Sequence, residues 1–208
     1  MVWFADRQQA GRMLAERLAE HPLTDPVVLG LPRGGVPVAA EIARALDAPL
    51  DVLVVRKLGF PGHEEFAMGA VGEGGARALN EQVAAGVASR DFERIEAREK
   101  AEVEQRVARF RERRAAVDLR GRTAIIVDDG IATGATARAA CAVARARGAD
   151  VIVLAVPVAA PDSLAELADA ADEIVCLHAP PGFMAVGMHY VDFRQVEDAE
   201  VVRLLRGR

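Results

Sequence analysis

The hydrophobic positions of the chain follow two alternating patterns. Short runs of consecutive apolar, mostly β-branched residues are typical of strands that are buried on both faces of a sheet. We expect such strands at 27–31, 50–55, 124–127, 151–156 and 173–177. Between them, apolar residues recur every three or four positions, which predicts helices. The alternation of strands and helices predicts an α/β fold with a central parallel sheet flanked by helices.

Capping residues set the expected ends of these helices. Asp6 and Gln9 form a capping-box pattern that opens the first helix, and Pro22 marks its end. We expect Asp162 or Ser163 to cap a later helix. The helices are expected at about 6–21, 36–47, 89–114, 137–147, 162–171 and 197–205.

The segment 89–114 is the longest regular stretch. Its apolar residues share one stripe at helical spacing, namely Phe92, Ile95, Val103, Val107 and Phe110. Acidic residues gather in its first half and arginines at its end, which suits the helix dipole. We interpret it as an amphipathic helix with a solvated charged face. The alternative is a subunit contact in a homo-oligomer, whereas the interspersed acids disfavour nucleic-acid binding.

One segment, 58–75, interrupts the alternation. It contains six glycines, and we expect a mobile loop that leads into a short hairpin with arms at 66–71 and 76–79. The sequence does not indicate whether this loop closes over a site.

The last part of the chain changes in character. From His178 to Arg194 it gathers proline, aromatic and methionine residues with little periodicity. We interpret residues 178–208 as a small hood that folds back over a core of about 1–177. Residues 1–208 would then form a single domain.

Composition narrows the class of protein. The chain has 208 residues, of which 51% are hydrophobic, and a formal net charge of −5, which argues against a general nucleic-acid binder. It has no apolar run of membrane length and no signal peptide, so we expect no membrane partner. Cys141 and Cys176 lie in apolar contexts and are expected to be buried thiols, which fits a cytoplasmic location.

The stretch 123–137 carries the most chemical information. Asp128 and Asp129 follow a buried strand, and Thr133 and Thr136 stand at the start of a helix. Backbone N–H groups and hydroxyls at a helix N-terminus can bind a phosphate. The carboxylates would repel a phosphate and suit sugar hydroxyls or a divalent cation. The alternative is an ordinary turn, but adjacent acids at the end of a buried strand are costly without a ligand.

A second candidate site is the turn 32–35. Its two glycines, Gly34 and Gly35, allow a ligand to approach the backbone closely. Arg33 adds a positive charge at the carboxyl end of a strand, where ligands of α/β folds bind. Lys57, one of only two lysines in the chain, stands at the expected end of the next strand. A plain turn and a solvated lysine are the alternatives.

The stretch from Ala124 to Thr136 resembles the signature of type I phosphoribosyltransferases, which bind 5-phosphoribosyl-1-diphosphate (PRPP). It has four apolar residues, two acids, a short spacer and Thr-Gly-x-Thr, and it lacks both a Walker A and a Rossmann pattern. The resemblance implies that fold, with a small flexible-loop hairpin and a C-terminal hood. It also implies transfer of the phosphoribosyl group from PRPP to a nitrogen heterocycle in nucleotide metabolism, with release of pyrophosphate and with Mg²⁺ as cofactor.

The resemblance implies residue roles as well. The loop from Ala132 to Thr136 would anchor the 5′-phosphate. Asp128 and Asp129 would hold the ribose hydroxyls, favour a cationic transition state, and hold the metal through ribose or water. Arg33 and Lys57 would contact pyrophosphate, in a family whose first loop often has a non-proline cis peptide. Catalytic candidates are Asp128, Asp129 and Arg33. PRPP-binding candidates are Arg33, Gly34, Gly35, Lys57, Asp128, Asp129, Ala132, Thr133, Gly134, Ala135 and Thr136.

The tail resembles the nucleobase-binding hood of purine phosphoribosyltransferases. The resemblance implies that Phe183 and Met184 lie near a base, with a core role for Phe183 as the alternative. Ala132 stands where hypoxanthine-guanine enzymes have an aspartate, and no lysine follows Lys100. We therefore do not expect a 6-oxopurine acceptor. The alternative to an enzyme is a regulatory protein that senses PRPP or a nucleotide without turnover.

Overall fold

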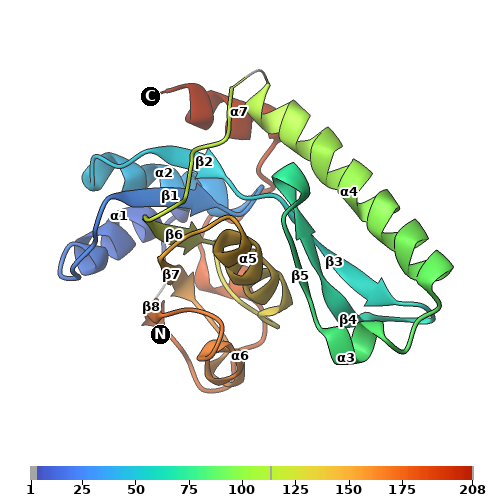
Figure 1. The fold of residues 1–208 in the computed structure, drawn as a ribbon. Coiled ribbons are helices and arrows are strands. Elements are labelled where there is room, and N and C mark those ends of the chain that lie inside the picture. The colour runs from blue at the N-terminus through green and yellow to red at the C-terminus, as the bar shows by residue number, and fades with distance from the viewer. Residues whose placement is uncertain (1–3, 113, 208) are drawn as a thin grey trace.

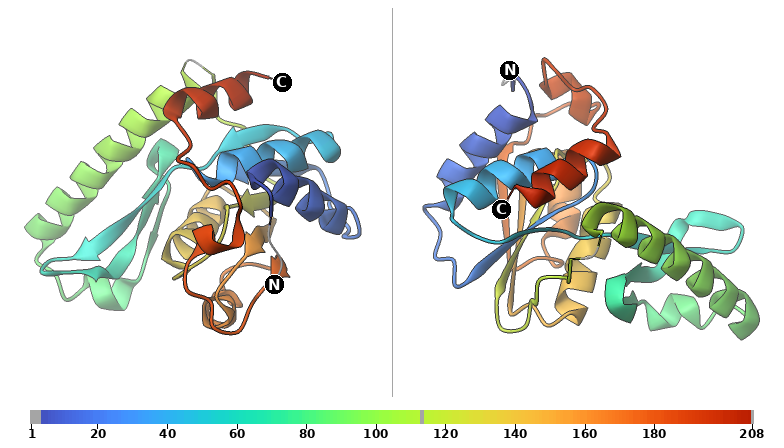
Figure 2. Two further views of the ribbon diagram at one scale, coloured as in Figure 1. Left: turned by 180° about the vertical axis from the view of Figure 1, so that it is seen from behind. Right: turned by 90° about the horizontal axis from the view of Figure 1, so that it is seen from above.

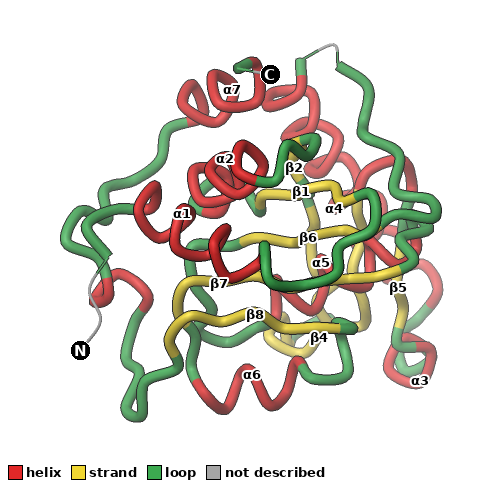
Figure 3. Tube along the Cα trace, turned by 90° about the vertical axis from the view of Figure 1, so that its left-hand side faces the viewer, coloured by secondary structure: helices red, strands yellow, loops and turns green. Residues whose placement is uncertain are grey.

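The computed structural model describes residues 4–112 and 114–207. A parallel five-stranded sheet forms the centre, in the order β2-β1-β6-β7-β8 (Figures 1 and 3). Its strands are β1 (Pro26–Gly30), β2 (Leu50–Val52), β6 (Thr123–Val127), β7 (Val151–Val158) and β8 (Glu173–His178). The predicted α/β class and central parallel sheet are confirmed.

Helices cover both faces of the sheet. The flanking helices are α1 (Arg7–Leu18), α2 (Gly35–Ala45), α5 (Ala135–Ala146) and α6 (Pro161–Leu167). Successive side chains of a strand point to opposite faces. In β6, Ile125 and Val127 accordingly pack with α1 and α2, whereas Ala124 and Ile126 pack with α5. The continuous apolar run of this strand therefore follows from burial on both faces.

An arm, defined as residues 55–111, extends from the central sheet (Figures 1 and 2). It contains an antiparallel three-stranded sheet, a short 3₁₀ helix and two α-helices. In chain order these are β3 (Val55–Phe60), β4 (His63–Gly72), η1 (Glu73–Gly75), β5 (Arg77–Leu79), α3 (Glu81–Ala84) and α4 (Ser89–Arg111). The predicted hairpin is confirmed, because β4 and β5 pair antiparallel over the expected arms at 66–71 and 76–79. The expected loop before it was wrong, because β3 and the start of β4 occupy most of that stretch. Register shifts around Gly59 disturb the alternation that would have indicated β3.

The predicted helix with one apolar stripe is confirmed in α4. Ile95, Val103 and Phe110 are buried against the arm sheet and against α7 (Asp198–Arg206). The helix also carries ion pairs such as Arg106–Glu102, at 2.8 Å.

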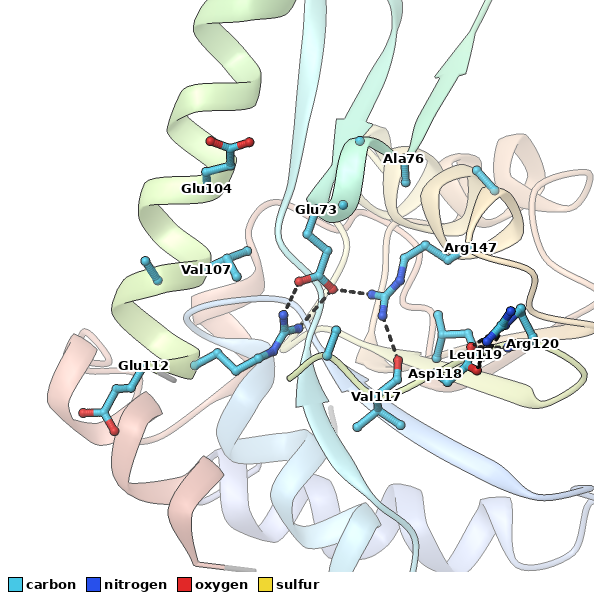
Figure 4. Close-up of a pocket in the computed structure, with 16 residues that line it drawn as sticks. Glu73, Ala76, Glu104, Val107, Glu112, Val117, Asp118, Leu119, Arg120 and Arg147 are labelled. Carbon is cyan, nitrogen blue, oxygen red and sulfur yellow. Dashed lines mark hydrogen bonds and ion pairs between the residues drawn. The ribbon is translucent and has the colours of Figure 1, made fainter. Parts of the chain in front are cut away.

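A buried cluster of charges joins the arm to the core (Figure 4). Arg111 donates from Nε to Asp51 at 2.9 Å and from a terminal nitrogen to Glu73 at 3.0 Å. Arg147, which follows α5, also pairs with Glu73 and donates to the Val117 carbonyl at 2.8 Å. Burial opposes the charge of Arg111, but its bonds to Glu73 and Asp51 outweigh burial and raise its pKa. The cluster lines a cavity of about 960 Å³.

Two predicted caps have different outcomes. The Gln9 amide donates to the Asp6 carboxylate at 2.7 Å, so the first cap is confirmed. Neither Asp162 nor Ser163 caps α6, whose N-cap position is Ala160 and has no side-chain cap. The Ser163 hydroxyl instead donates to the Ala132 carbonyl at 2.6 Å, across to the loop that precedes α5.

Both cysteines are free thiols. Cys141 is buried in α5 and Cys176 is half-buried in β8, and burial raises the pKa of Cys141 to about 12. In the part of the chain that the structure describes, no helix is long and apolar enough to cross a membrane.

Candidate active site

The candidate site is a cavity of about 690 Å³ at the carboxyl ends of β1 and β6. Parallel strands place their following loops at the same edge of a sheet, which is where α/β folds bind ligands. The loop 31–34, the acids Asp128 and Asp129, and Thr136 at the start of α5 line one side. Side chains of α4 and residues 193–198 line the other. The arm and the end of the chain therefore complete a cavity whose floor is the central sheet.

Asp129 is held in place from two distant segments. Arg7 donates from Nε to the Asp129 carboxylate at 2.8 Å and from a terminal nitrogen to the Arg194 carbonyl at 2.9 Å. The Arg7 guanidinium also lies 4.0 Å from the centre of the Phe193 ring, a cation–π contact. The Tyr190 hydroxyl donates to the Asp129 carbonyl at 2.6 Å. The first helix and the hood thus fix the orientation of this acid.

Asp128 has fewer partners than Asp129. One of its carboxylate oxygens accepts a hydrogen bond from the Asp129 amide at 2.9 Å, and it has no ion pair among the described residues. Burial and the neighbouring Asp129 carboxylate raise the pKa of Asp128 well above its usual value. Burial also raises the pKa of Asp129, although Arg7 opposes that rise. A cationic ligand or a divalent metal would relieve this repulsion.

The turn 32–35 packs directly against the acidic loop. The Pro32–Arg33 peptide bond is cis. A side chain at Gly34 would overlap the Asp129 carboxylate, and one at Gly35 would overlap the Val127 carbonyl. We expected these glycines to allow close approach of a ligand, but the close approach in the structure is between the two loops. Arg33 faces the cavity, with its guanidinium 3.5 Å from the Asp198 carboxylate.

The loop 132–136 leads into the start of α5. Gly134 has a φ of 72°, which a residue with a side chain rarely adopts, and α5 begins without a side-chain cap. Thr136 lines the cavity, while Ala132 and Thr133 are exposed. An uncapped helix start has free N–H groups and a partial positive charge, which suit a phosphate.

Of the predicted site residues, Arg33, Gly34, Asp128, Asp129 and Thr136 line this cavity, whereas Gly35 and residues 132–135 adjoin its lining in sequence without being part of it. Lys57, Phe183 and Met184 lie elsewhere. Lys57 lies within β3, not after a core strand, and lines other cavities beside α4 and α5. Phe183 stacks on His189, with ring centres 5.6 Å apart, and Met184 is 78% exposed. Their roles in pyrophosphate and base binding stay predictions. The aromatic residue of the hood that lines the cavity is Phe193.

Arg7, Arg109 and Asp198 were missed by sequence reasoning. Arg7 is the first residue of the first helix. The local sequence around it does not distinguish it from an arginine that is exposed to solvent. Its partner lies 122 positions away. Arg109 and Asp198 belong to charged helix faces that local periodicity assigns to solvent. We find no local signal that would have indicated any of the three.

The chain is similar to known proteins in sequence and in fold. The model of the phosphoribosyl transferase domain matches residues 5–185. "Putative phosphoribosyl transferase Rv0571c" of Mycobacterium tuberculosis (strain ATCC 25618 / H37Rv) is 55% identical over 207 residues, covering 99% of this chain and 47% of that protein. The crystal structure of TT1426 from Thermus thermophilus has a TM-score of 0.93 and 46% identity, covering 98% of each chain.

The chain therefore belongs to the phosphoribosyl transferase family. Both the resemblance to this family and the predicted fold are confirmed. The likeness to TT1426 covers nearly the whole chain, so it includes the arm and the C-terminal segment. The chain spans about half the length of the curated relative that it matches.

Proposed function

We propose that the protein transfers the phosphoribosyl group of PRPP to a nitrogen heterocycle and releases pyrophosphate. One observation carries the proposal, namely that Asp128, the uncapped start of α5 and Arg33 face a single cavity. These three features match the ribose, the 5′-phosphate and the diphosphate of PRPP. Lys57 lines other cavities, so its contact with the diphosphate stays a prediction.

The proposed chemistry is a displacement at C1 of the ribose. The bond from C1 to the diphosphate oxygen breaks, its electron pair leaves with pyrophosphate, and a ring nitrogen forms the new bond. A proton carried by the acceptor ring is lost to pyrophosphate or to water. Positive charge develops on C1 and the ring oxygen, as in glycoside chemistry. Asp128 and Asp129 would stabilise that charge, and Arg33 the charge on pyrophosphate. No side-chain nucleophile is needed, so catalysis would rest on positioning and electrostatics.

The residues present fit a role for Mg²⁺. Asp128 offers a carboxylate without an ion pair among the described residues, whereas Asp129 is already bound by Arg7. The described part of the chain contains no group of three or more His, Cys, Asp or Glu residues that could hold a metal. Mg²⁺ commonly binds through one or two carboxylates together with substrate phosphates and water. When bound, it would offset the negative charge of the diphosphate.

The proposal is tested by binding and by turnover. We expect Mg-PRPP to raise the melting temperature, since a ligand at a hundred times its Kd stabilises a protein by about 2.7 kcal/mol. We also expect pyrophosphate release with at least one acceptor in a screen of purines, pyrimidines and related heterocycles. An unchanged melting curve at millimolar Mg-PRPP would contradict PRPP binding. Tight binding without turnover in the whole screen would favour a sensor.

We expect hypoxanthine and guanine to be poor acceptors. Ala132 cannot exchange a proton with N7, and proton transfer typically contributes on the order of a hundredfold to rate. No lysine follows Lys100 to donate to the 6-oxo group, and a buried unpaired polar group costs about 1–3 kcal/mol. Competition at equal acceptor concentrations gives the ratio of kcat/KM values. A higher kcat/KM for hypoxanthine or guanine than for adenine would contradict this expectation.

A further inference from the structure

The candidate cavity contains a balanced set of opposite charges. Its arginines are Arg7, Arg33, Arg106 and Arg109, and its acids are Glu102, Asp128, Asp129 and Asp198. Arg7 pairs with Asp129 and Arg106 pairs with Glu102, each at 2.8 Å. The remaining two arginines share one acid.

Asp198 is that shared acid. Its Oδ2 lies 2.8 Å from the Arg109 guanidinium and its Oδ1 lies 3.5 Å from the Arg33 guanidinium. The two arginines come from different parts of the fold, since Arg33 follows β1 and Arg109 is on α4. Two guanidiniums that converge on the oxygens of one carboxylate form a geometry that also suits a phosphate group.

The ion pairs of Asp198 with Arg33 and Arg109 are accessible to solutes, and a ligand can displace them. The side chains of Arg33, Asp198 and Arg109 are 39%, 32% and 55% exposed, so a solute can reach them. Ion pairs with this degree of exposure contribute little to stability. Asp198 also opens α7, and an aspartate in the first turn of a helix is favourable without an arginine partner. Losing both arginines would therefore cost Asp198 little.

We propose that Arg109 and Arg33 form a binding subsite for a diphosphate group, and that Asp198 is a built-in anion that competes for it. A diphosphate carries more charge than one carboxylate and would take both arginines, releasing Asp198. The identity of the ligand rests on the proposed function, in which the diphosphate is that of PRPP. Arg109 then becomes a binding residue contributed by the arm, and Asp198 sets how tightly the diphosphate binds.

Titration calorimetry with sodium pyrophosphate tests the proposal directly. Asp198→Asn removes the competing charge, so we expect its affinity for pyrophosphate to rise about tenfold over the native protein. Glu200→Gln is the matched control, because it removes one negative charge two positions later on the same helix. Glu200 has no ion pair with Arg33 or Arg109 in the described part of the chain. We expect the control to change affinity less than about twofold.

A double-mutant cycle identifies the arginine. Arg109→Ala should weaken pyrophosphate binding by about fivefold or more, and it should remove most of the gain of Asp198→Asn in the combined variant. Arg120→Ala, which removes an exposed arginine outside the cavity, is its control. The comparison of Arg109→Ala with Arg120→Ala remains valid even if the Asp198→Asn variant does not fold.

Three results would overturn the proposal. The first is no pyrophosphate binding by any variant. The second is an Asp198→Asn affinity no higher than that of Glu200→Gln, which would leave Asp198 as a tether between α7 and α4. The third is a gain that persists after Arg109→Ala. Pyrophosphate release from PRPP is measured separately, so a subsite without turnover would refute only the proposed function. Turnover without any effect of Asp198 would refute only this inference.

Discussion

Replacing Asp128 with asparagine is expected to lower kcat by more than it raises KM for PRPP. The substitution keeps the shape of the side chain and removes the charge that would stabilise the cationic transition state. Losing one preorganised electrostatic group typically costs on the order of a hundredfold or more in kcat. Steady-state kinetics with PRPP varied separates the two constants. The same result is expected for Asp129→Asn. A change in KM alone in both variants would contradict the electrostatic role.

Stability provides the control for this experiment. The raised pKa of Asp128 means that the folded state binds a proton more tightly than the unfolded chain does. The free energy of unfolding therefore falls as pH rises from the unfolded pKa to the raised folded pKa, and the cost persists above it. Asp128→Asn should relieve that cost and be more stable than the native protein at neutral pH. The difference in the free energy of unfolding between Asp128→Asn and the native protein should vanish at acid pH, where Asp128 is protonated in both the folded and the unfolded states.

Asp129→Asn should behave differently in the same unfolding experiment. Its carboxylate neutralises Arg7, whose side chain is 9% exposed. Removing one partner of a buried pair leaves the other charge without compensation. We therefore expect Asp129→Asn to be less stable than Asp128→Asn at neutral pH. Equal free energies of unfolding for Asp129→Asn and Asp128→Asn would show that burying the Arg7 charge does not require the Asp129 carboxylate.

Arg111→Ala is expected to lower the free energy of unfolding by about 3–5 kcal/mol, because it breaks a buried ion pair. The Arg111 side chain is 5% exposed, and its loss leaves Asp51 and Glu73 without this partner. Urea denaturation measures the change. Arg120→Ala is the matched control, since Arg120 pairs with Asp118 at 2.7 Å but is 80% exposed. Exposed pairs of this kind contribute little to stability. Similar losses in the two variants would mean that the buried cluster adds no more than a surface pair.

The parts of the site that sequence could predict are those made by one continuous segment. The run from β6 through Asp128 to the start of α5 has its structure set by local apolar pattern, acids and glycine. The missing parts come from contacts between distant residues. Ser163 has the sequence features of a cap, yet its hydroxyl bonds to a loop 31 positions earlier. Local sequence patterns indicate which interactions a residue can make, but they do not indicate which distant residue will be its partner.

The order of the strands also bears on how the site forms. β1 and β6 are hydrogen-bonded neighbours in the sheet, yet β2 and the whole arm lie between them in the sequence. Because Gly34 packs on Asp129, the turn after β1 gains its final surroundings only when β6 is in place. Contacts of such high sequence separation carry a large loop-closure entropy and slow folding. On the ribosome, a nascent chain that ends before Asp129 cannot contain a complete site, however well its first two strands have paired.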